Sequence, residues 1–205
     1  MENKAEKVMR KKTAFKVEMD KRLTKEQSDS AWENACRLLN DFYRKYEDIS
    51  EGEKNHTTGF IFPAAAIYLS LKKIDADIAF SIMRNVMKAR SEKMGKGLAK
   101  ALKISGLKTL FIKMWDVVSH KMFGPACGFR NVFYPNEKGS FRMDITQCPY
   151  NKYLTELGCP EITKLFCDND VYMYSNLPGV RFTRTKTLGY GNELCDFKME
   201  TERKS

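Results

Sequence analysis

Apolar residues recur at three- and four-residue steps through the first 120 positions of the chain. One such stripe runs from Trp32 to Tyr46, which predicts a helix with one buried face. A second helix is expected to begin at Pro63, because proline suits the first helical position. Asp75 is expected to cap a third helix, and Gly95 is expected to end it.

The hydrophobic pattern changes near Gly124. A last long helix is expected over residues 103–122, and beyond it the apolar residues alternate with polar ones, as in Phe141-Arg142-Met143-Asp144-Ile145-Thr146, which is typical of strands with one buried face. Short strands joined by tight turns favour an antiparallel sheet covered by helices on one face. We therefore expect an α+β fold, with N-terminal helices packed on a C-terminal antiparallel sheet. The strands are predicted over residues 129–134, 141–146, 180–187 and 195–199, with a short helix over 150–157.

The length of 205 residues suits a single compact domain. Within it, we expect a basic and mobile segment over residues 1–25, a helical part over residues 26–123, and a sheet part over residues 124–199. The start of the chain is charged and lacks an apolar stretch, so no secretory signal is expected. The longest uncharged run has 15 residues (57–71), fewer than the ~20 that span a membrane. A cytoplasmic location and no membrane partner are therefore expected.

The formal net charge is +10. A basic surface favours a small anionic substrate, and it is also compatible with nothing more than a solvated surface. Nothing in the sequence matches a nucleic-acid-binding module, so we expect no nucleic-acid partner. A homo-oligomer is left open. The sequence has no Walker loop, no G-x-G-x-x-G and no G-x-S-x-G, which argues against nucleotide cofactors and serine hydrolase chemistry.

Three cysteines, Cys148, Cys167 and Cys195, have polar or charged neighbours, whereas structural cysteines prefer apolar surroundings. Their spacings are 19 and 28 residues (167−148 and 195−167), so only the fold can bring them together. We expect all three to line one pocket. Cys36 lies on the apolar stripe of its helix and is expected to be a core residue. Six cysteines are too few for a disulfide scaffold of this length.

The segment Cys167-Asp168-Asn169-Asp170 combines a nucleophile with two carboxylates. Asp168 or Asp170 could relay a proton or orient a substrate amine. A helix is expected to begin after Cys167, and its dipole would stabilise a thiolate there. Cys167 is therefore predicted to be the most reactive thiol, with Cys148 and Cys195 as the alternatives. The same segment also suits a plain helix cap, because Asp and Asn are strong capping residues.

A metal site is the competing interpretation of these cysteines. Cys148, Cys167 and Cys195 could bind zinc, with Glu193 as the fourth ligand, although no C-x₂₋₄-C pair is present. His56 and His120 are the two histidines of the chain, and no spacing supports a cysteine–histidine pair with either. Our expectation is no cofactor, with zinc as the exception to be tested.

Arginine and threonine alternate over residues 181–187. Arg184 could grip a substrate carboxylate in bidentate fashion, and Thr185 and Thr187 could supply hydroxyls. A solvated strand face explains the same pattern.

The sheet part also resembles a known family. The resemblance rests on five stretches of the sequence, in order: Phe141-Arg142-Met143-Asp144-Ile145-Thr146-Gln147-Cys148-Pro149-Tyr150, Glu156-Leu157-Gly158, Cys167-Asp168-Asn169-Asp170, Arg184-Thr185-Lys186-Thr187-Leu188 and Gly191-Asn192-Glu193-Leu194-Cys195-Asp196-Phe197. Over residues 124–199 these stretches resemble the L-2-amino-thiazoline-4-carboxylate hydrolase family.

The resemblance implies a small cytosolic hydrolase that opens a cyclic amidine at a non-peptide carbon–nitrogen bond. In the mechanism that we expect, a thiolate attacks the amidine carbon, an aspartate protonates the leaving nitrogen, and water releases the covalent intermediate. Direct attack by an activated water is the alternative. The candidate catalytic residues are Cys167, Asp168, Asp170, Cys148 and Cys195. The candidate substrate-binding residues are Arg184, Thr185, Thr187, Arg142, Tyr150 and Asp196.

A second resemblance is to ligand-sensing domains of the 4-vinyl-reductase type. It implies a module that binds a small molecule without turnover and holds zinc on its cysteines. About one zinc per chain in the purified protein would favour this alternative. A third hypothesis is a basic interaction protein, for which salt-dependent nucleic-acid binding is the test.

Overall fold

A computed structural model describes residues 4–202 of the chain apart from 105, 136 and 138. The helices are α1 (Lys4–Met9), α2 (Thr13–Asp20), α3 (Lys25–Lys45), α4 (Glu51–His56), α5 (Phe62–Lys72), α6 (Ala76–Ala101), α7 (Leu107–Met122), α8 (Pro149–Glu156) and α9 (Thr163–Tyr174). The strands are β1 (Arg130–Phe133), β2 (Ser140–Gln147), β3 (Val180–Thr183) and β4 (Cys195–Thr201). No helix in this part of the chain is both long and apolar enough to cross a membrane.

The four strands form one antiparallel sheet in the order β1-β2-β4-β3. The α+β fold with N-terminal helices and a C-terminal antiparallel sheet is therefore confirmed. The predicted alternation of β2 is present in part. Phe141, Met143 and Ile145 are buried and Arg142 and Thr146 are exposed, but Asp144 is buried as well. Across the β2–β4 ladder, Met143 pairs with Phe197, so these residues lie on the same face of the sheet.

Local sequence signals explain how the main helices begin. The Thr24 side chain accepts a hydrogen bond from the backbone of Gln27 at the start of α3, and the Gln27 side chain accepts one from the backbone of Thr24. The apolar stripe that predicted this helix packs into the core. Asp75 caps α6 as predicted, because its carboxylate accepts from the backbone N–H of Ile78.

One predicted helix end is wrong for a tertiary reason, and one predicted helix start is confirmed. Gly95 does not end α6, which continues to Ala101. A Cβ at Gly95 would lie 2.8 Å from the carbonyl oxygen of Met173, so this glycine allows α9 to approach α6 closely. The predicted helix start near Pro63 is confirmed, because α5 begins at Phe62 with Pro63 in its first turn, although the preceding segment Thr57–Ile61 is π-helical and continues from α4.

The predicted strand over residues 180–187 is too long. β3 ends at Thr183, and the following residues leave the sheet. Their backbone turns toward Asp196, whose carboxylate accepts the N–H groups of Thr185 and Lys186. Two hydrogen bonds to one carboxylate replace the sheet hydrogen bonds that the Arg/Thr alternation had suggested.

The N-terminal helices carry their own buried residues. Residues 4–20 are helical, and Ala5, Met9, Phe15 and Met19 are buried in the helical core. Residues 1–3 lie outside the described part of the chain. The proposed division at residues 25 and 123, and the mobility of the first segment, stay predictions.

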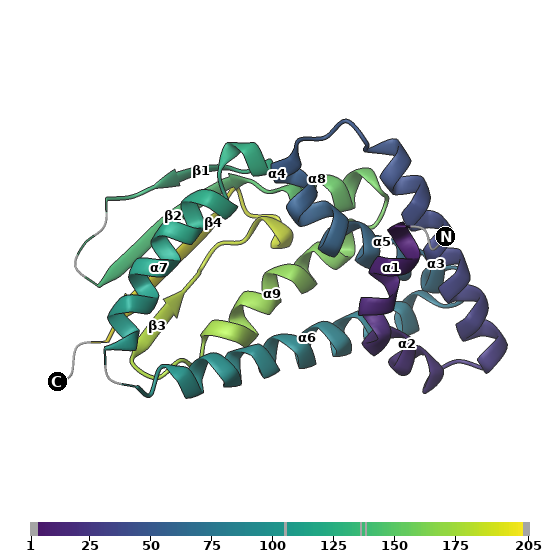
Figure 1. Cartoon of the computed structure of the whole chain (residues 1–205), viewed down its shortest axis with the longest axis horizontal. Helices are drawn as coiled ribbons and strands as arrows, with labels where there is room; N and C mark the ends of the chain where they lie inside the picture. Colours follow the sequence, from purple (N-terminus) through teal and green to yellow (C-terminus); the bar gives the residue numbers. More distant parts are fainter. Residues whose placement is uncertain (1–3, 105, 136, 138, 203–205) are drawn as a thin grey trace.

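The buried residues form two clusters. One joins α1–α3, α5 and α6 with α8 and the start of α9, and the other joins the sheet with α7 and the end of α9. In Figure 1, α6 and α9 lie side by side and run from the helical end of the molecule to the sheet and α7. Tyr150 packs against both clusters. The region between the clusters is therefore where a cavity can form.

Candidate active site

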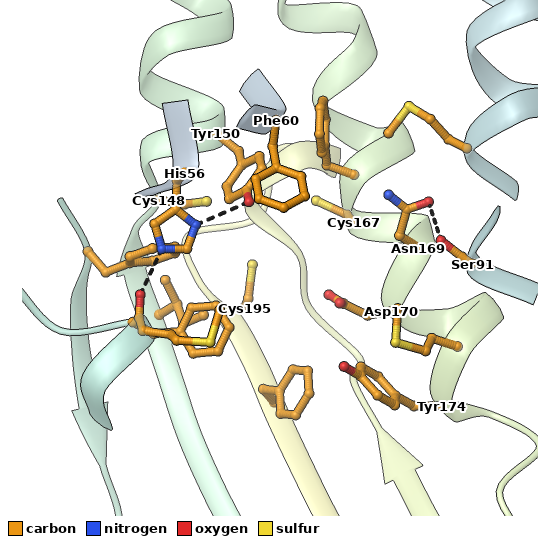
Figure 2. A pocket seen from close by; sticks show the side chains of 18 of the residues that line it. His56, Phe60, Ser91, Cys148, Tyr150, Cys167, Asn169, Asp170, Tyr174 and Cys195 are labelled. Carbon is orange, nitrogen blue, oxygen red and sulfur yellow. Dashed lines mark hydrogen bonds between the residues drawn. The ribbon is translucent and has the colours of Figure 1, made fainter. Parts of the chain in front are cut away.

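A cavity of about 580 Å³ lies between the two clusters. Three of its lining residues are Cys148, Cys167 and Cys195, which come from the start of α8, from α9 and from the start of β4. Figure 2 shows the three sulfur atoms around this cavity. Cys36 is not among the lining residues and packs against the helical core instead. The fold thus brings together the three cysteines that have polar or charged neighbours in the sequence.

One face of α9 supplies most of the polar groups. Cys167, Asp170 and Tyr174 all line the cavity, and their spacing of three and then four residues places them on one side of the helix (Figure 2). The prediction that a helix begins after Cys167 is wrong, because α9 begins at Thr163. Cys167 therefore lies inside the helix, where the N-terminal dipole has little effect.

The cysteine at a helix start is Cys148, which directly precedes α8. Backbone N–H groups of Asn151 and Tyr150 lie near its sulfur and favour the thiolate, but burial dominates and raises the pKa of Cys148 to about 12. Burial likewise raises the pKa of Cys167 to about 12, although the nearby charge of Arg184 opposes this rise. Both thiols are protonated at neutral pH.

Cys195 has a different environment. Its sulfur accepts the backbone N–H of Leu188 at 3.2 Å. Burial raises the pKa of Cys195, while this hydrogen bond and the charge of Arg184 oppose the rise. Since Cys195 opposes Ile145 in the β2–β4 ladder, the sheet fixes its position on the cavity wall.

Asp170 and Arg184 form an ion pair at the cavity. One guanidinium nitrogen of Arg184 donates to Asp170 at 2.8 Å and another donates to the carbonyl oxygen of Cys167 at 2.7 Å. The Arg184 side chain is only 6% exposed. The Asp170 side chain keeps 38% of its surface accessible, yet it lines the cavity, so that surface faces the cavity interior. Burial raises the pKa of Asp170 to about 6, against the opposing effect of Arg184.

His56 is a cavity residue that the sequence pattern did not single out. Its Nε2 lies 2.8 Å from the carbonyl oxygen of Met122 and its Nδ1 lies 3.1 Å from the hydroxyl of Tyr150 (Figure 2). A carbonyl oxygen only accepts, so Nε2 carries the proton and Nδ1 accepts from Tyr150. Burial lowers the pKa of His56, and the neutral ring acts as a brace between α4, α7 and α8.

Several candidate residues lie away from the cavity lining. Asp168 accepts a hydrogen bond from the hydroxyl of Tyr190 at 2.7 Å. Arg142 lies 3.5 Å from Asp144 and over the ring of Tyr134. Neither Asp168 nor Arg142 lines the cavity.

The remaining candidates belong to the loop after β3. Thr185 donates its hydroxyl to Asp196 at 2.6 Å, and the N–H of Thr187 donates to the side chain of Asn192. Glu193 pairs with Lys186 at 2.5 Å. None of these four predicted residues, Thr185, Thr187, Glu193 and Asp196, lines the cavity. The loop instead fixes the position of Arg184, which does.

The ligand set that we named for zinc is not assembled as a cluster. Within the described ranges, no group of three or more His, Cys, Asp or Glu side chains is placed to hold a metal ion. The zinc alternative therefore rests on the sequence alone.

The rest of the cavity wall is mostly apolar. A signal for part of it is present in the sequence, since Cys167, Asp170 and Tyr174 have helical spacing. No sequence signal predicts which core aromatics face the cavity, because that choice depends on how α6, α7 and the sheet meet. The large apolar lining residues are Phe15, Phe60, Val86, Met87, Met94, Trp115, Met122, Phe123, Phe129, Phe166, Met173 and Phe197.

The fold and the cavity define an α+β protein that gathers three thiols and a carboxylate–guanidinium pair in one apolar cavity. The sequence model of the L-2-amino-thiazoline-4-carboxylic acid hydrolase family matches residues 54–199, and the chain belongs to this family. The match begins well before the sheet part, so it includes α5, α6 and α7 as well. The family is named for a hydrolase.

Other comparisons add little. No curated protein matches the chain. A solved structure from a study entitled "Probing the function of heme distortion in the H-NOX family" is 11% identical, with a TM-score of 0.28, over 82% of this chain and 93% of that chain. A likeness this weak supports no conclusion about this protein.

Proposed function

We propose that the protein hydrolyses a small cyclic amidine and opens its ring at a carbon–nitrogen bond, with Cys167 as nucleophile and Asp170 as proton-transfer group. The observation that carries the proposal is the adjacency of these two groups on one face of α9, inside a cavity that two further thiols also line. Family membership supports the reaction class. The activity is expected to need no cofactor.

The pKa values favour a particular order of events. Because burial raises the pKa of Cys167 to about 12, a free thiolate is scarce at neutral pH. Asp170, whose pKa is raised to about 6, is ionised at neutral pH and lies three residues along the same helix, within reach of a side-chain neighbour. The thiol therefore loses its proton to Asp170 while its sulfur attacks the amidine carbon.

The following steps return every proton. The new S–C bond forms as the C=N π bond opens, and the ring nitrogen takes up the proton that Asp170 received from the thiol. The C–N bond then breaks as the other amidine nitrogen forms a C=N bond, and the proton that this nitrogen loses passes through Asp170 to the leaving ring nitrogen. Water adds across this C=N bond, placing its oxygen on carbon and one proton on nitrogen, and the S–C bond breaks as the remaining hydroxyl proton returns to the Cys167 sulfur. The net reaction is the addition of one water to the ring.

Arg184 acts in this scheme as a positioning residue. Its two hydrogen bonds tie the Asp170 carboxylate to the backbone of Cys167, and its charge lowers the pKa of both side chains. Because two of its N–H donors are already engaged by the protein, contact with a substrate carboxylate would use the other N–H groups of the guanidinium. Such a contact stays a prediction, as do substrate-binding roles for Thr185, Thr187 and Asp196.

The test is turnover of a panel of cyclic amidines that includes L-2-amino-thiazoline-4-carboxylate, with ring-opened product detected by mass spectrometry. We expect product with wild-type protein and a covalent adduct on Cys167 when the reaction is quenched early. Cys167→Ser should abolish both, whereas Cys36→Ser, a cysteine outside the cavity, should retain full turnover. Full turnover by Cys167→Ser would contradict the nucleophile and favour an activated water with Asp170 as its base.

A ligand-binding module without turnover is the second candidate. The size and apolar lining of the cavity favour it, because such cavities commonly enclose ligands. Tight binding of a panel member without any product, by protein that contains about one zinc per chain, would support this alternative. Binding without zinc would support a simple binding role.

A further inference from the structure

We propose that the substrate of this site is an amphipathic acid, with an apolar ring-bearing body inside the cavity and an anionic group against Lys12 and Arg90. This inference rests on the proposed function for its reaction and goes beyond it in the class of molecule. It starts from the size of the cavity. A volume of about 580 Å³ falls in the ~300–1,000 Å³ range of sites that enclose drug-sized ligands, larger than a single thiazoline ring with one carboxylate requires.

The lining matches an apolar body. Aromatic and methionine side chains from α2, α6, α7, α9 and the sheet surround the cavity, and Phe60 also lines it although 44% of its surface is accessible. A small, highly polar substrate would leave much of this wall in contact with water. Methionine adapts well to ring-shaped ligands, and aromatic rings stack on them.

A pair of cations meets this apolar wall at the N-terminal side. Lys12 and Arg90 both line the cavity, and they come from η1 (Arg10–Lys12) and α6. The Lys12 ammonium donates to the carbonyl oxygen of Gly59 at 2.7 Å and lies 5.4 Å from the ring centre of Phe60. That carbonyl uses one of three N–H donors, so two remain for a ligand.

Among residues 4–202 that the structure describes, no carboxylate forms an ion pair with Lys12 or Arg90. Burial, together with the positive charges of Arg90 and Lys11, lowers the pKa of Lys12 to about 8. Two like charges beside an apolar cavity are unfavourable alone, and an anion between them relieves the repulsion.

Other cations of the lining fit the anion less well. Arg184 is paired with Asp170. Lys121, near the end of α7, is exposed, so water screens its charge more than that of half-buried Lys12. Arg90 is exposed as well, but it lies close enough to Lys12 to lower its pKa. Lys121 therefore provides the matched control, since it is a cation on the same cavity lining.

The experiment uses two fluorescent probes that share an aromatic body. 8-Anilinonaphthalene-1-sulfonate carries one negative charge, and N-phenyl-1-naphthylamine carries none. We expect both to bind wild-type protein. The double variant Lys12→Met with Arg90→Met should raise the Kd of the sulfonate about tenfold, the effect of one moderately strong charge contact, and should leave the Kd of the neutral amine within about twofold.

Several outcomes would overturn the proposal. They are the absence of binding by either probe, equal weakening of both probes, no change for the sulfonate, or a larger effect of Lys121→Met than of the double variant. Thermal melting shows whether each variant is folded, and a variant that has unfolded is replaced by the single change Arg90→Met, at an exposed position. That variant should weaken the sulfonate alone, and any other result with it also counts against the proposal.

Probe binding does not depend on turnover, so the two proposals can fail separately. Charge-selective binding in a protein that hydrolyses no cyclic amidine would contradict the proposed function alone. Hydrolysis of L-2-amino-thiazoline-4-carboxylate without charge-selective binding would contradict the amphipathic acid alone.

Discussion

Asp170 and Asp196 are the same residue type, 26 positions apart (196−170), but their pKa values shift in opposite directions. Asp170 lines the cavity with one charged partner, and burial raises its pKa to about 6. Burial also acts on Asp196, but hydrogen bonds from Thr185 and Lys186 outweigh it and lower the pKa. The number of hydrogen-bond donors around each carboxylate therefore determines which of the two stays ionised.

The contrast separates a carboxylate suited to proton transfer from one that stabilises the structure. A carboxylate held by three short hydrogen bonds, as Asp196 is, gains little from accepting a proton and serves as an anchor. A carboxylate that titrates near neutral pH inside a cavity suits proton transfer. Consecutive residues of one loop serve the two sites, because Arg184 contacts Asp170 while Thr185 contacts Asp196.

The strongest test of the contrast is Asp170→Asn. We expect kcat/KM for a cyclic amidine to fall ~10²–10⁴-fold, the usual contribution of a general acid–base group. Asp168→Asn, two residues away and outside the cavity, is the matched control and should stay near wild type. Thermal melting accompanies both, because Arg184 loses its partner in Asp170→Asn. Equal rates for a folded Asp170→Asn protein would remove Asp170 from the mechanism.

Asp196→Ala should act on stability instead. Removal of a carboxylate that accepts three hydrogen bonds should lower the free energy of unfolding by about 1–3 kcal/mol, measured by urea denaturation. Glu193→Ala, which loses only a surface pair with Lys186, should change it by less than ~0.5 kcal/mol. If Asp196→Ala reduced kcat/KM of the folded protein as much as Asp170→Asn, the division into anchor and proton-transfer group would be wrong.

The pH dependence of activity should follow Asp170. Its carboxylate must be ionised to accept the thiol proton, so kcat/KM should fall about tenfold per pH unit below about pH 6. The effect on folding has the opposite sign, because a raised pKa in the folded state means that ionisation of Asp170 costs stability as pH rises from 3.8 to about 6. If kcat/KM of a folded Asp170→Asn protein still fell in the same way below about pH 6, this acid limb of the pH profile would belong to another group.

Arg184→Lys should have the smallest effect. Lysine keeps the charge but cannot donate simultaneously from the two positions of the guanidinium fork, so Asp170 is held less firmly. We expect kcat/KM to fall by about tenfold and the acid limb to move above pH 6, because the hydrogen bond from Arg184, which opposes the rise in the pKa of Asp170, is weakened while the charge is kept. An unchanged limb would show that Arg184 does not tune Asp170.

Much of the fold was predictable because it depends on local patterns. The alternation in β2 and the cap at Asp75 are properties of neighbouring residues. The sequence predicts the start of α9 too late, because Asp168 and Asn169 are typical capping residues. In the structure, the 3₁₀ turn Pro160–Ile162 leads directly into the helix. The role of Gly95 depends on a second helix and has no local signal.

The candidate site was predictable in its thiols but not in its electrostatics. Polar neighbours in the sequence picked out Cys148, Cys167 and Cys195, which the fold gathers. The pairing of Asp170 with Arg184 depends on how the loop after β3 returns to α9. Likewise, the approach of Lys12 to Arg90 needs the N-terminal helices packed against α6. Such contacts between distant segments leave no pattern along the chain.

The central position of β4 has a consequence for biosynthesis. β4 pairs with both β2 and β3, yet it follows both in chain order. A ribosome-bound chain that has exposed everything up to β3 can pack its helices, but β3 has no partner strand and β2 keeps one open edge, the kind of edge that recruits other chains. The cavity wall that carries Cys195 and Phe197 closes only when β4 emerges. Slow synthesis of this stretch would therefore lengthen the period in which the nascent protein is prone to aggregate.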